Sequence, residues 1–205
     1  MISTIKGSIL LENGSIYDPC KNKKIKGSVL LNNGIVKEVG KCSPPKNVKR
    51  VNCQGKIIAP GLIDIHAHFR EPGREDKETL VTGATAAFSG GFTRVCIMPN
   101  TNPPLDTPES IRFIVEKSAN LPIHIFPIGA ITRHQAGIEI TEIGEMVQAG
   151  AVAISDDGMP VQNGQVMRYA VEYAQRFNIP VINHAEDIYL MNDGVMNEST
   201  LSTQL

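Results

Sequence analysis

The sequence has little of what would indicate a secreted, membrane-bound or nucleic-acid-binding protein. It has no tryptophan, and its four cysteines form no C-x-x-C pair. The cysteines argue against a disulfide framework, and we expect reduced thiols in a cytoplasmic protein. No apolar run approaches the roughly 20 residues of a membrane span, and Lys6 and Gly7 interrupt the N-terminus too early for a signal peptide. The 20 basic residues nearly balance the 21 acidic ones, which gives no reason to expect nucleic acid or an anionic membrane as partner.

Residues 1–55 are rich in Lys, Asn and Gly, and they contain a short internal repeat. The segment 7–14 (GSILLENG) resembles the segment 27–34 (GSVLLNNG), and each copy is an apolar run that ends in Asn-Gly. Asn-Gly readily adopts the positive φ angles of a tight hairpin turn, so the repeat predicts two β-hairpins. We expect a small β domain over residues 1–55 with no chemistry of its own.

From residue 56 onward, short apolar runs alternate with helical patterns. Thr107-Pro108-Glu109 is a strong helix start, and Gly150 is a helix stop. Such alternation predicts parallel strands with right-handed crossovers, in either a doubly wound sheet or a (β/α)8 barrel. The expected strands are Ile57–Ile65, Thr93–Met98, Ile123–Ile128, Ala151–Ile154 and Pro180–Ile182.

Polar residues that can bind a metal follow several of these strands. His66 and His68 are two apart and so point to one side of a strand, where two imidazoles can hold one ion. Asn100 follows the second strand, Asp156 and Asp157 follow the fourth, and His184 closes the fifth. Active sites of (β/α)8 barrels lie at these carboxyl ends, so the positions favour the barrel over the open sheet. We predict an α/β protein with the first five strands of a (β/α)8 TIM-type barrel, preceded by a small β-sandwich-like N-terminal unit.

Three further side chains, Arg70, His124 and His134, are candidates for a role at this site. Arg70 is either a surface residue paired with Glu71 or Asp76, or a fork that binds a substrate carboxylate. His124 begins the third strand, at the end away from the site, and is expected to be structural. His134 lies in the loop after that strand, where a surface position is expected.

The segment 64–73 (DIHAHFREPG) closely resembles the metal-binding signature of bacterial type I dihydroorotases, members of the amidohydrolase superfamily. Four further segments resemble that family in the same order, and together they cover essentially the whole chain: 90–93 (GGFT), 98–104 (MPNTNPP), 155–158 (SDDG) and 183–187 (NHAED).

The resemblance implies a zinc enzyme of pyrimidine biosynthesis that interconverts N-carbamoyl-L-aspartate and dihydroorotate, with one or two zinc ions per site. It implies that His66 and His68 bind the first zinc, that Asp157 bridges two metals, and that His184 binds the second. It also implies that Arg70 and Asn100 hold the substrate carboxylate, with His68 close to the substrate. Hydantoinases, dihydropyrimidinases and allantoinases usually bridge with a carboxylated lysine, and residues 151–158 contain none.

The chain departs from the family at its end. The family continues with three more barrel strands, which carry the catalytic aspartate. We therefore expect residues 56–205 to be a partial amidohydrolase barrel, with no catalytic residue before Leu205. We also expect a homodimer. For the function, the alternatives to a dihydroorotase are a hydantoinase or allantoinase, or a non-catalytic subunit that partners aspartate transcarbamoylase.

Overall fold

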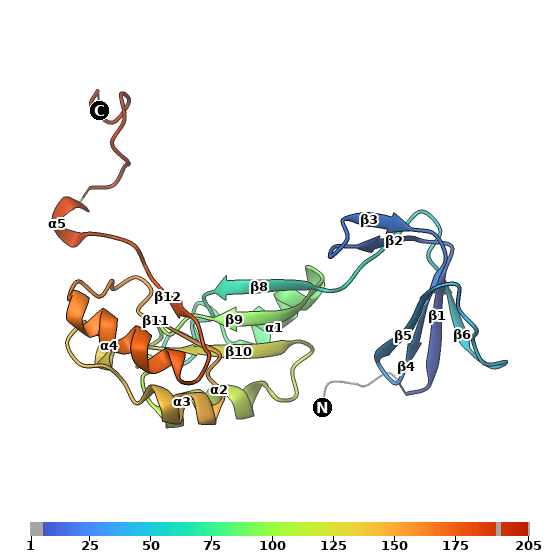
Figure 1. Ribbon diagram of the computed structural model, residues 1–205, viewed down its shortest axis with the longest axis horizontal. Helices are drawn as coiled ribbons and strands as arrows, with labels where there is room; N and C mark the ends of the chain where they lie inside the picture. Colours follow the sequence, from blue (N-terminus) through green and yellow to red (C-terminus); the bar gives the residue numbers. More distant parts are fainter. Residues whose placement is uncertain (1–5, 192–193, 205) are drawn as a thin grey trace.

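The computed structural model describes residues 6–191 and 194–204, which form a β unit and an α/β unit that lie side by side along the long axis (Figure 1). The β unit has a four-stranded sheet in the order β5-β4-β1-β6 and a three-stranded sheet in the order β3-β2-β7. Its strands are β1 (Ser8–Glu12), β2 (Ser15–Asp18), β3 (Lys23–Ile25), β4 (Ser28–Asn32), β5 (Ile35–Gly40), β6 (Lys49–Asn52) and β7 (Ile57–Ile58).

One of the two predicted hairpins is present and the other is wrong. Asn33 and Gly34 both have positive φ angles, and β4 and β5 pair antiparallel around them. In the first Asn-Gly pair, Asn13 has a positive φ angle but Gly14 does not, and β1 and β2 enter different sheets. A Cβ atom on Gly14 would lie 2.9 Å from that of Cys53, so this glycine is required for close packing between the sheets.

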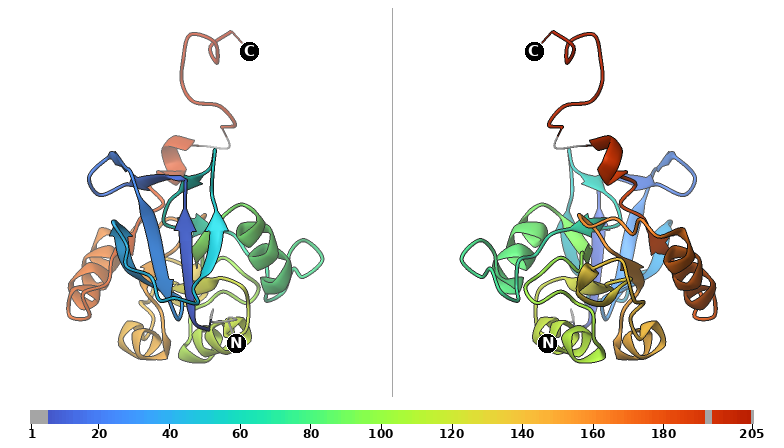
Figure 2. Two further views of the ribbon diagram at one scale, coloured as in Figure 1. Left: turned by 90° about the vertical axis from the view of Figure 1, so that its right-hand side faces the viewer. Right: turned by 90° about the vertical axis from the view of Figure 1, so that its left-hand side faces the viewer.

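The α/β unit contains one parallel sheet in the order β12-β11-β10-β9-β8, which is the order of the chain. This order, without a switch point, is that of a barrel wound in one direction, and the sheet is curled as a partial barrel. The helices α1 to α4 lie outside the curl, as the end-on views show (Figure 2). The predicted partial (β/α)8 barrel is therefore confirmed. Its strands are β8 (Leu62–Ala67), β9 (Phe92–Ile97), β10 (His124–Gly129), β11 (Ala153–Ser155) and β12 (Val181–Ile182).

The first expected barrel strand, Ile57–Ile65, is in fact two strands. Ile57 and Ile58 form β7, which pairs with β2 in the β unit, and β8 begins only at Leu62. Pro60 between them has no N–H to donate, and Gly61 packs so closely on Thr93 that a Cβ atom would lie 2.1 Å from that side chain. The chain therefore crosses from one unit to the other at residues 59–61.

Helices α1 to α4 pack on the outer face of the sheet through one large apolar cluster. Thr107 caps α2 with its hydroxyl and Pro108 occupies the first turn, as predicted, while Gly150 ends α3 with a φ of 119°. A smaller cluster of Met98, Ile128 and Ala153 lies apart, with Cys96 packed against it. Among the described residues no helix is long and apolar enough to cross a membrane. The helices are α1 (Leu80–Ser89), α2 (Pro108–Ser118), the 3-10 turn Arg133–Gln135, α3 (Ile143–Ala149), α4 (Gly164–Gln175) and α5 (Ile188–Met191).

Candidate metal centre

His66 and His68 lie at the carboxyl end of β8, where the strand is irregular. The pairing of β8 with β9 shifts register between Asp64 and Ala67. The carboxylate of Asp64 accepts a hydrogen bond from the backbone N–H of His66 at 3.0 Å, which stabilises this irregular stretch. Both imidazoles then point to one side, and their Nε2 atoms lie 3.2 Å apart.

Asp156 and Asp157 follow β11 and have separate roles. Asp156 is buried and accepts hydrogen bonds from the backbone N–H groups of Ile131 and Thr132 and from the Thr132 hydroxyl. Burial raises the pKa of the Asp156 carboxyl, although these hydrogen bonds act in the opposite direction. Asp156 therefore fixes the loop after β10, and the neighbouring Asp157 is left to face the histidines.

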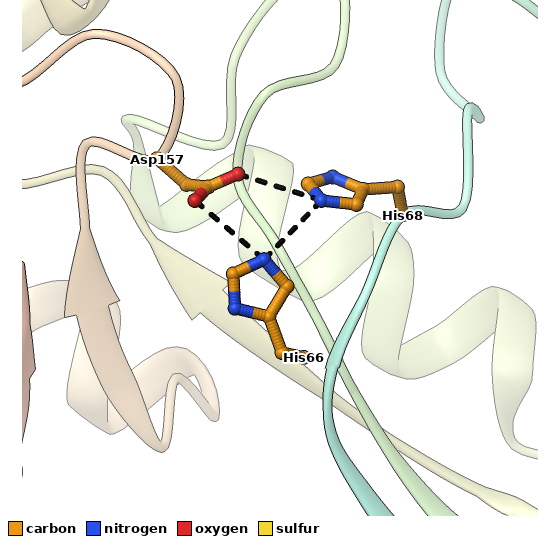
Figure 3. Close-up of side chains that lie close together, drawn as sticks. All are labelled: His66, His68 and Asp157. Carbon is orange, nitrogen blue, oxygen red and sulfur yellow. Dashed lines mark hydrogen bonds and ion pairs between the residues drawn. The ribbon is translucent and has the colours of Figure 1, made fainter. Parts of the chain in front are cut away.

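The carboxylate of Asp157 lies between the histidines of β8 and the histidine after β12. Its Oδ1 is 3.5 Å from Nε2 of His66 and its Oδ2 is 3.5 Å from Nε2 of His68 (Figure 3). On the other side, Nδ1 of His184 is 3.3 Å from the same Oδ1, and Nε2 of His184 is 3.7 Å from the carboxylate of Glu186. The other three predicted metal ligands, His66, His68 and His184, thus each lie within 3.5 Å of the Asp157 carboxylate.

The described residues contain one group of three or more ligand-type side chains that could hold a metal ion, namely His66, His68 and Asp157. Their ligand atoms all lie within 4.8 Å of one another. The Asp157 side chain is 9 % exposed, whereas that of His66 is 46 % exposed, so the group opens to solvent on one side. A buried carboxylate against two imidazole nitrogens is a donor set that favours a cation, because only a cation or a proton can relieve the repulsion between facing lone pairs.

Asn100 follows β9 by three residues and lies between two members of this group. Its Oδ1 is 2.9 Å from Nδ1 of His68, and its Nδ2 donates to Oδ2 of Asp157 at 3.3 Å. In the sequence, the family resemblance connects Asn100 with the substrate carboxylate only. Its contacts with His68 and Asp157 were not foreseen, since no pattern links positions that are 32 and 57 residues apart.

Arg70 is half-buried in the loop after β8, and neither proposed surface partner binds it. The carboxylate of Asp76 forms two hydrogen bonds with Arg74. Glu71 is 3 % exposed, and it accepts from the Leu80 N–H at 2.7 Å and from the ammonium of Lys117. Within the described part of the chain, the Arg70 guanidinium therefore has no carboxylate partner.

The other two histidines lie away from this group. His124 is exposed at the start of β10 and stacks on Phe126, with ring centroids 6.3 Å apart. The side chain of His134 is 83 % exposed, and its backbone N–H donates to Asp106 at 2.8 Å. A surface position of His134 is as predicted.

The ion pair of the buried Glu71 with the half-exposed Lys117 and the loop contact of Asp156 were missed in the sequence. Glu71 lies inside the segment 64–73, but its partner Lys117 is 46 residues away in the last turn of α2. A separate role for Asp156 could have been predicted from its position next to Asp157, because only one of two adjacent residues after a strand can face the barrel axis.

Comparison with known proteins identifies the family of this chain. Residues 55–205 match the family described as dihydro-orotase-like. A dihydroorotase of Geobacter metallireducens is 44% identical over 200 residues, and one of Desulforapulum autotrophicum is 43% identical over 207 residues. These matches cover 97% and 100% of this chain but 47% of each relative, so the chain spans about half the length of the curated relatives that it matches.

Solved structures show the same fold at low sequence identity. The L-hydantoinase of Arthrobacter aurescens superposes with a TM-score of 0.77 at 18% identity, over 90% of this chain and 42% of that one. The D-hydantoinase of a Thermus species superposes with a TM-score of 0.71 at 20% identity, also over 90% and 42%. These structures share the fold of the partial (β/α)8 barrel, and the match over residues 55–205 shows that the chain belongs to the dihydroorotase-like family.

Proposed function

We propose that this chain carries the metal centre of a zinc-dependent cyclic amidohydrolase, a dihydroorotase that interconverts N-carbamoyl-L-aspartate and dihydroorotate in pyrimidine biosynthesis. The single observation that carries the proposal is the Asp157 carboxylate, which faces His66 and His68 on one side and His184 on the other. In the hydantoinase and allantoinase relatives, a carboxylated lysine usually bridges the metals. Residues 151–158 contain no lysine, so the dihydroorotase is favoured over those enzymes.

The spacing of the ligand atoms fits a small divalent ion such as zinc. Zn²⁺ binds histidine nitrogen and carboxylate oxygen at about 2.0–2.2 Å in a tetrahedral arrangement, which puts neighbouring ligand atoms roughly 3.3–3.5 Å apart. The separations among His66, His68 and Asp157 are 3.2, 3.5 and 3.5 Å. Direct hydrogen bonds between charged groups are shorter, at about 2.7–2.9 Å. In this proposal His66 and His68 would hold the first zinc, His184 would hold a second, and Asp157 would be a ligand of both.

The protein residues would hold the substrate and the ligands in place. When bound, a divalent ion polarises the ring amide carbonyl and lowers the pKa of a bound water from ~15.7 toward ~7. The guanidinium of Arg70 would bind the substrate carboxylate through two parallel hydrogen bonds. Asn100 has a second amide hydrogen that is not used by Asp157, and it would donate this to the same carboxylate.

Proton transfer to the leaving nitrogen has no candidate beside the ligands. Within residues 6–191 and 194–204, only the carboxylates of Asp157 and Glu186 lie within 4.0 Å of a ring nitrogen of His66, His68 or His184. Asp157 is committed to the metal in this proposal, and Glu186 lies on the far side of His184. We assign no general acid within the described residues.

The experiment that tests the metal centre is zinc analysis of the purified chain and of His66→Ala. We expect the parent to retain zinc after dialysis and His66→Ala to lose it, because one of two adjacent imidazole ligands is removed. His124→Ala is the matched control, since this exposed histidine lies at the start of β10. Unchanged zinc in His66→Ala would contradict the assignment.

The substrate is tested on the zinc-loaded chain by calorimetric titration with dihydroorotate, hydantoin and allantoin. Only dihydroorotate carries a carboxylate for Arg70, so it should bind most tightly, and a preference for hydantoin or allantoin would favour the other cyclic amidohydrolases. The presence of all four ligand residues speaks against a non-catalytic subunit that partners aspartate transcarbamoylase. The proposal includes a cytoplasmic location and a homodimer, and sedimentation analysis of the purified protein tests the dimer.

A further inference from the structure

Asn100 contacts two of the proposed metal ligands at the same time, and this points to a role beyond substrate binding. The inference rests on the proposed metal centre. Asn100 is half-buried after β9, the strand next to β8, and its amide lies against the ring of His68 and the carboxylate of Asp157. It therefore connects a ligand from β8 with a ligand that follows β11.

The Asp157 carboxylate determines which way the Asn100 amide points. An ionised carboxylate can only accept hydrogen bonds, so the group that faces Oδ2 of Asp157 at 3.3 Å must be the Nδ2 donor. The other end of the amide, Oδ1, then faces Nδ1 of His68 at 2.9 Å. A reversed amide would set its oxygen against the carboxylate oxygen of Asp157 and lose this hydrogen bond.

The orientation of the amide in turn determines the tautomer of His68. An amide oxygen has no hydrogen to donate, so the hydrogen between Oδ1 and Nδ1 must be on the imidazole. In a neutral ring with Nδ1 protonated, Nε2 carries the lone pair. Nε2 is the atom that lies 3.2 Å from Nε2 of His66 and 3.5 Å from Asp157, where the metal would bind.

We propose that Asn100 is a positioning residue of the metal centre: it holds His68 in the Nδ1–H tautomer and orients the Asp157 carboxylate, so that both present lone pairs to the ion. A metal-bound histidine is typically oriented by a hydrogen bond from its other ring nitrogen, and loss of such a partner typically lowers metal affinity by about 10–100-fold. Asn100 supplies this bond for His68 and a second bond for Asp157.

The first test is the zinc affinity of the chain, measured by competition with a chelator. Asn100→Leu keeps the branched side-chain shape but removes both hydrogen bonds, and we expect its zinc affinity to fall by about 10–100-fold. Asn47→Leu is the matched control, because Asn47 is exposed in the β unit, and its affinity should equal that of the parent. Circular dichroism verifies that both variants are folded, and Asn100→Ala replaces Asn100→Leu if the leucine disrupts packing.

The second test reads the tautomer directly, by two-bond ¹H–¹⁵N spectra of the imidazoles in metal-free protein at about pH 8, where an ordinary imidazole is neutral. We expect His68 to carry its hydrogen on Nδ1 in the parent, where Oδ1 of Asn100 accepts it. In Asn100→Leu the hydrogen should move to Nε2, the form that free imidazole side chains prefer. A purely structural role of Asn100 would leave the tautomer unchanged.

The outcomes separate this proposal from the proposed function. If the parent binds zinc and Asn100→Leu binds it within threefold of the parent, the positioning role is refuted while the metal centre stands. An unchanged His68 tautomer in Asn100→Leu refutes it as well. If the parent binds no zinc, the metal centre itself is wrong and the positioning role falls with it.

Discussion

Replacing Lys117 with methionine should destabilise the α/β unit, because it leaves a buried carboxylate without its cation. The side chain of Glu71 is 5% exposed and that of Lys117 is 46% exposed. Loss of one partner from a fully buried pair typically destabilises by about 3–5 kcal/mol, and loss of an exposed pair by about 0–1 kcal/mol. The half-exposed lysine lies between these limits. Glu71 also keeps its hydrogen bond from the Leu80 N–H, so we expect about 1.5–2.5 kcal/mol.

Lys117 also lies over the ring of Phe113, at 5.1 Å from the centroid, and this contact must be separated from the ion pair. Glu71→Gln provides the separation, because it removes the charge and keeps an oxygen that can accept from Leu80. In that background, Lys117→Met should lower stability by no more than about 0.5 kcal/mol. The coupling between the two positions should then be about 1 kcal/mol or more.

The assay is thermal unfolding followed by the helical circular dichroism signal. The helices α1–α5 all belong to the α/β unit, so the signal reports on that unit. For a chain of this size, 1 kcal/mol corresponds to about 2–4 °C, so Lys117→Met should lower Tm by roughly 3–10 °C. Arg112→Met is the control on the same helix, since Arg112 pairs with Glu109 at 2.6 Å in an exposed position. If Lys117→Met and Arg112→Met lie within 0.5 kcal/mol of each other, the buried-carboxylate argument is wrong.

Four further outcomes can be measured on the same protein. Asp157→Ala should abolish zinc retention, whereas Asp156→Ala should retain zinc. The free energy of unfolding of Asp156→Ala should fall by about 2–4 kcal/mol, because buried N–H groups of the loop after β10 lose their acceptor. Equal zinc loss in both variants would contradict their separate roles. Gly73→Ala should lower Tm much more than Gly55→Ala. Both glycines have positive φ angles, but only at Gly73 would a Cβ atom clash with the Asn102 carbonyl oxygen, at 1.9 Å. Equal Tm changes would mean that the loop shifts to relieve this clash. Arg70→Ala should keep its zinc but weaken dihydroorotate binding by about tenfold or more in calorimetry, since a charge-assisted bond contributes ~1.5–3 kcal/mol; an unchanged Kd would leave Arg70 a surface residue. The zinc-loaded 205-residue chain should not hydrolyse dihydroorotate in a spectrophotometric assay, because no general acid is assigned within its described residues, and substantial turnover would refute this.

The ends of the barrel strands could be predicted from the sequence because their signals are local. An apolar run followed by His66 or Asp157 specifies both a buried strand and a polar group at its carboxyl end, and a cap such as Thr107 specifies where a helix begins. The partners of those polar groups could not be predicted in the same way. The contact of Asn100 with Asp157 depends on the curl of the sheet, which no short window of sequence encodes.

The β unit shows that a local sequence signal can also predict a structure that does not form. Asn13-Gly14 and Asn33-Gly34 have the same letters in the same pattern, yet only the second pair turns a hairpin. What separates them is the packing around Gly14, where side chains from Cys53 and Ile58 leave no room for a Cβ atom. Both neighbours are more than 35 residues away in sequence, so the repeat alone could not reveal the difference.

The candidate metal centre depends on the curvature of the parallel sheet. Neighbouring strands are about 4.8 Å apart, so β8 and β11, which are separated by three steps in the sheet, would lie roughly 14 Å apart if the sheet were flat. The ligand atoms of His66, His68 and Asp157 nevertheless lie within 4.8 Å of one another, because the curl and the inward reach of the side chains close that gap. An ion held there would link β8 and β11, two strands that share no hydrogen bonds with each other. Metal affinity would then report on the curvature of the sheet. A substitution that flattened the sheet far from the histidines would be detected first as a loss of zinc.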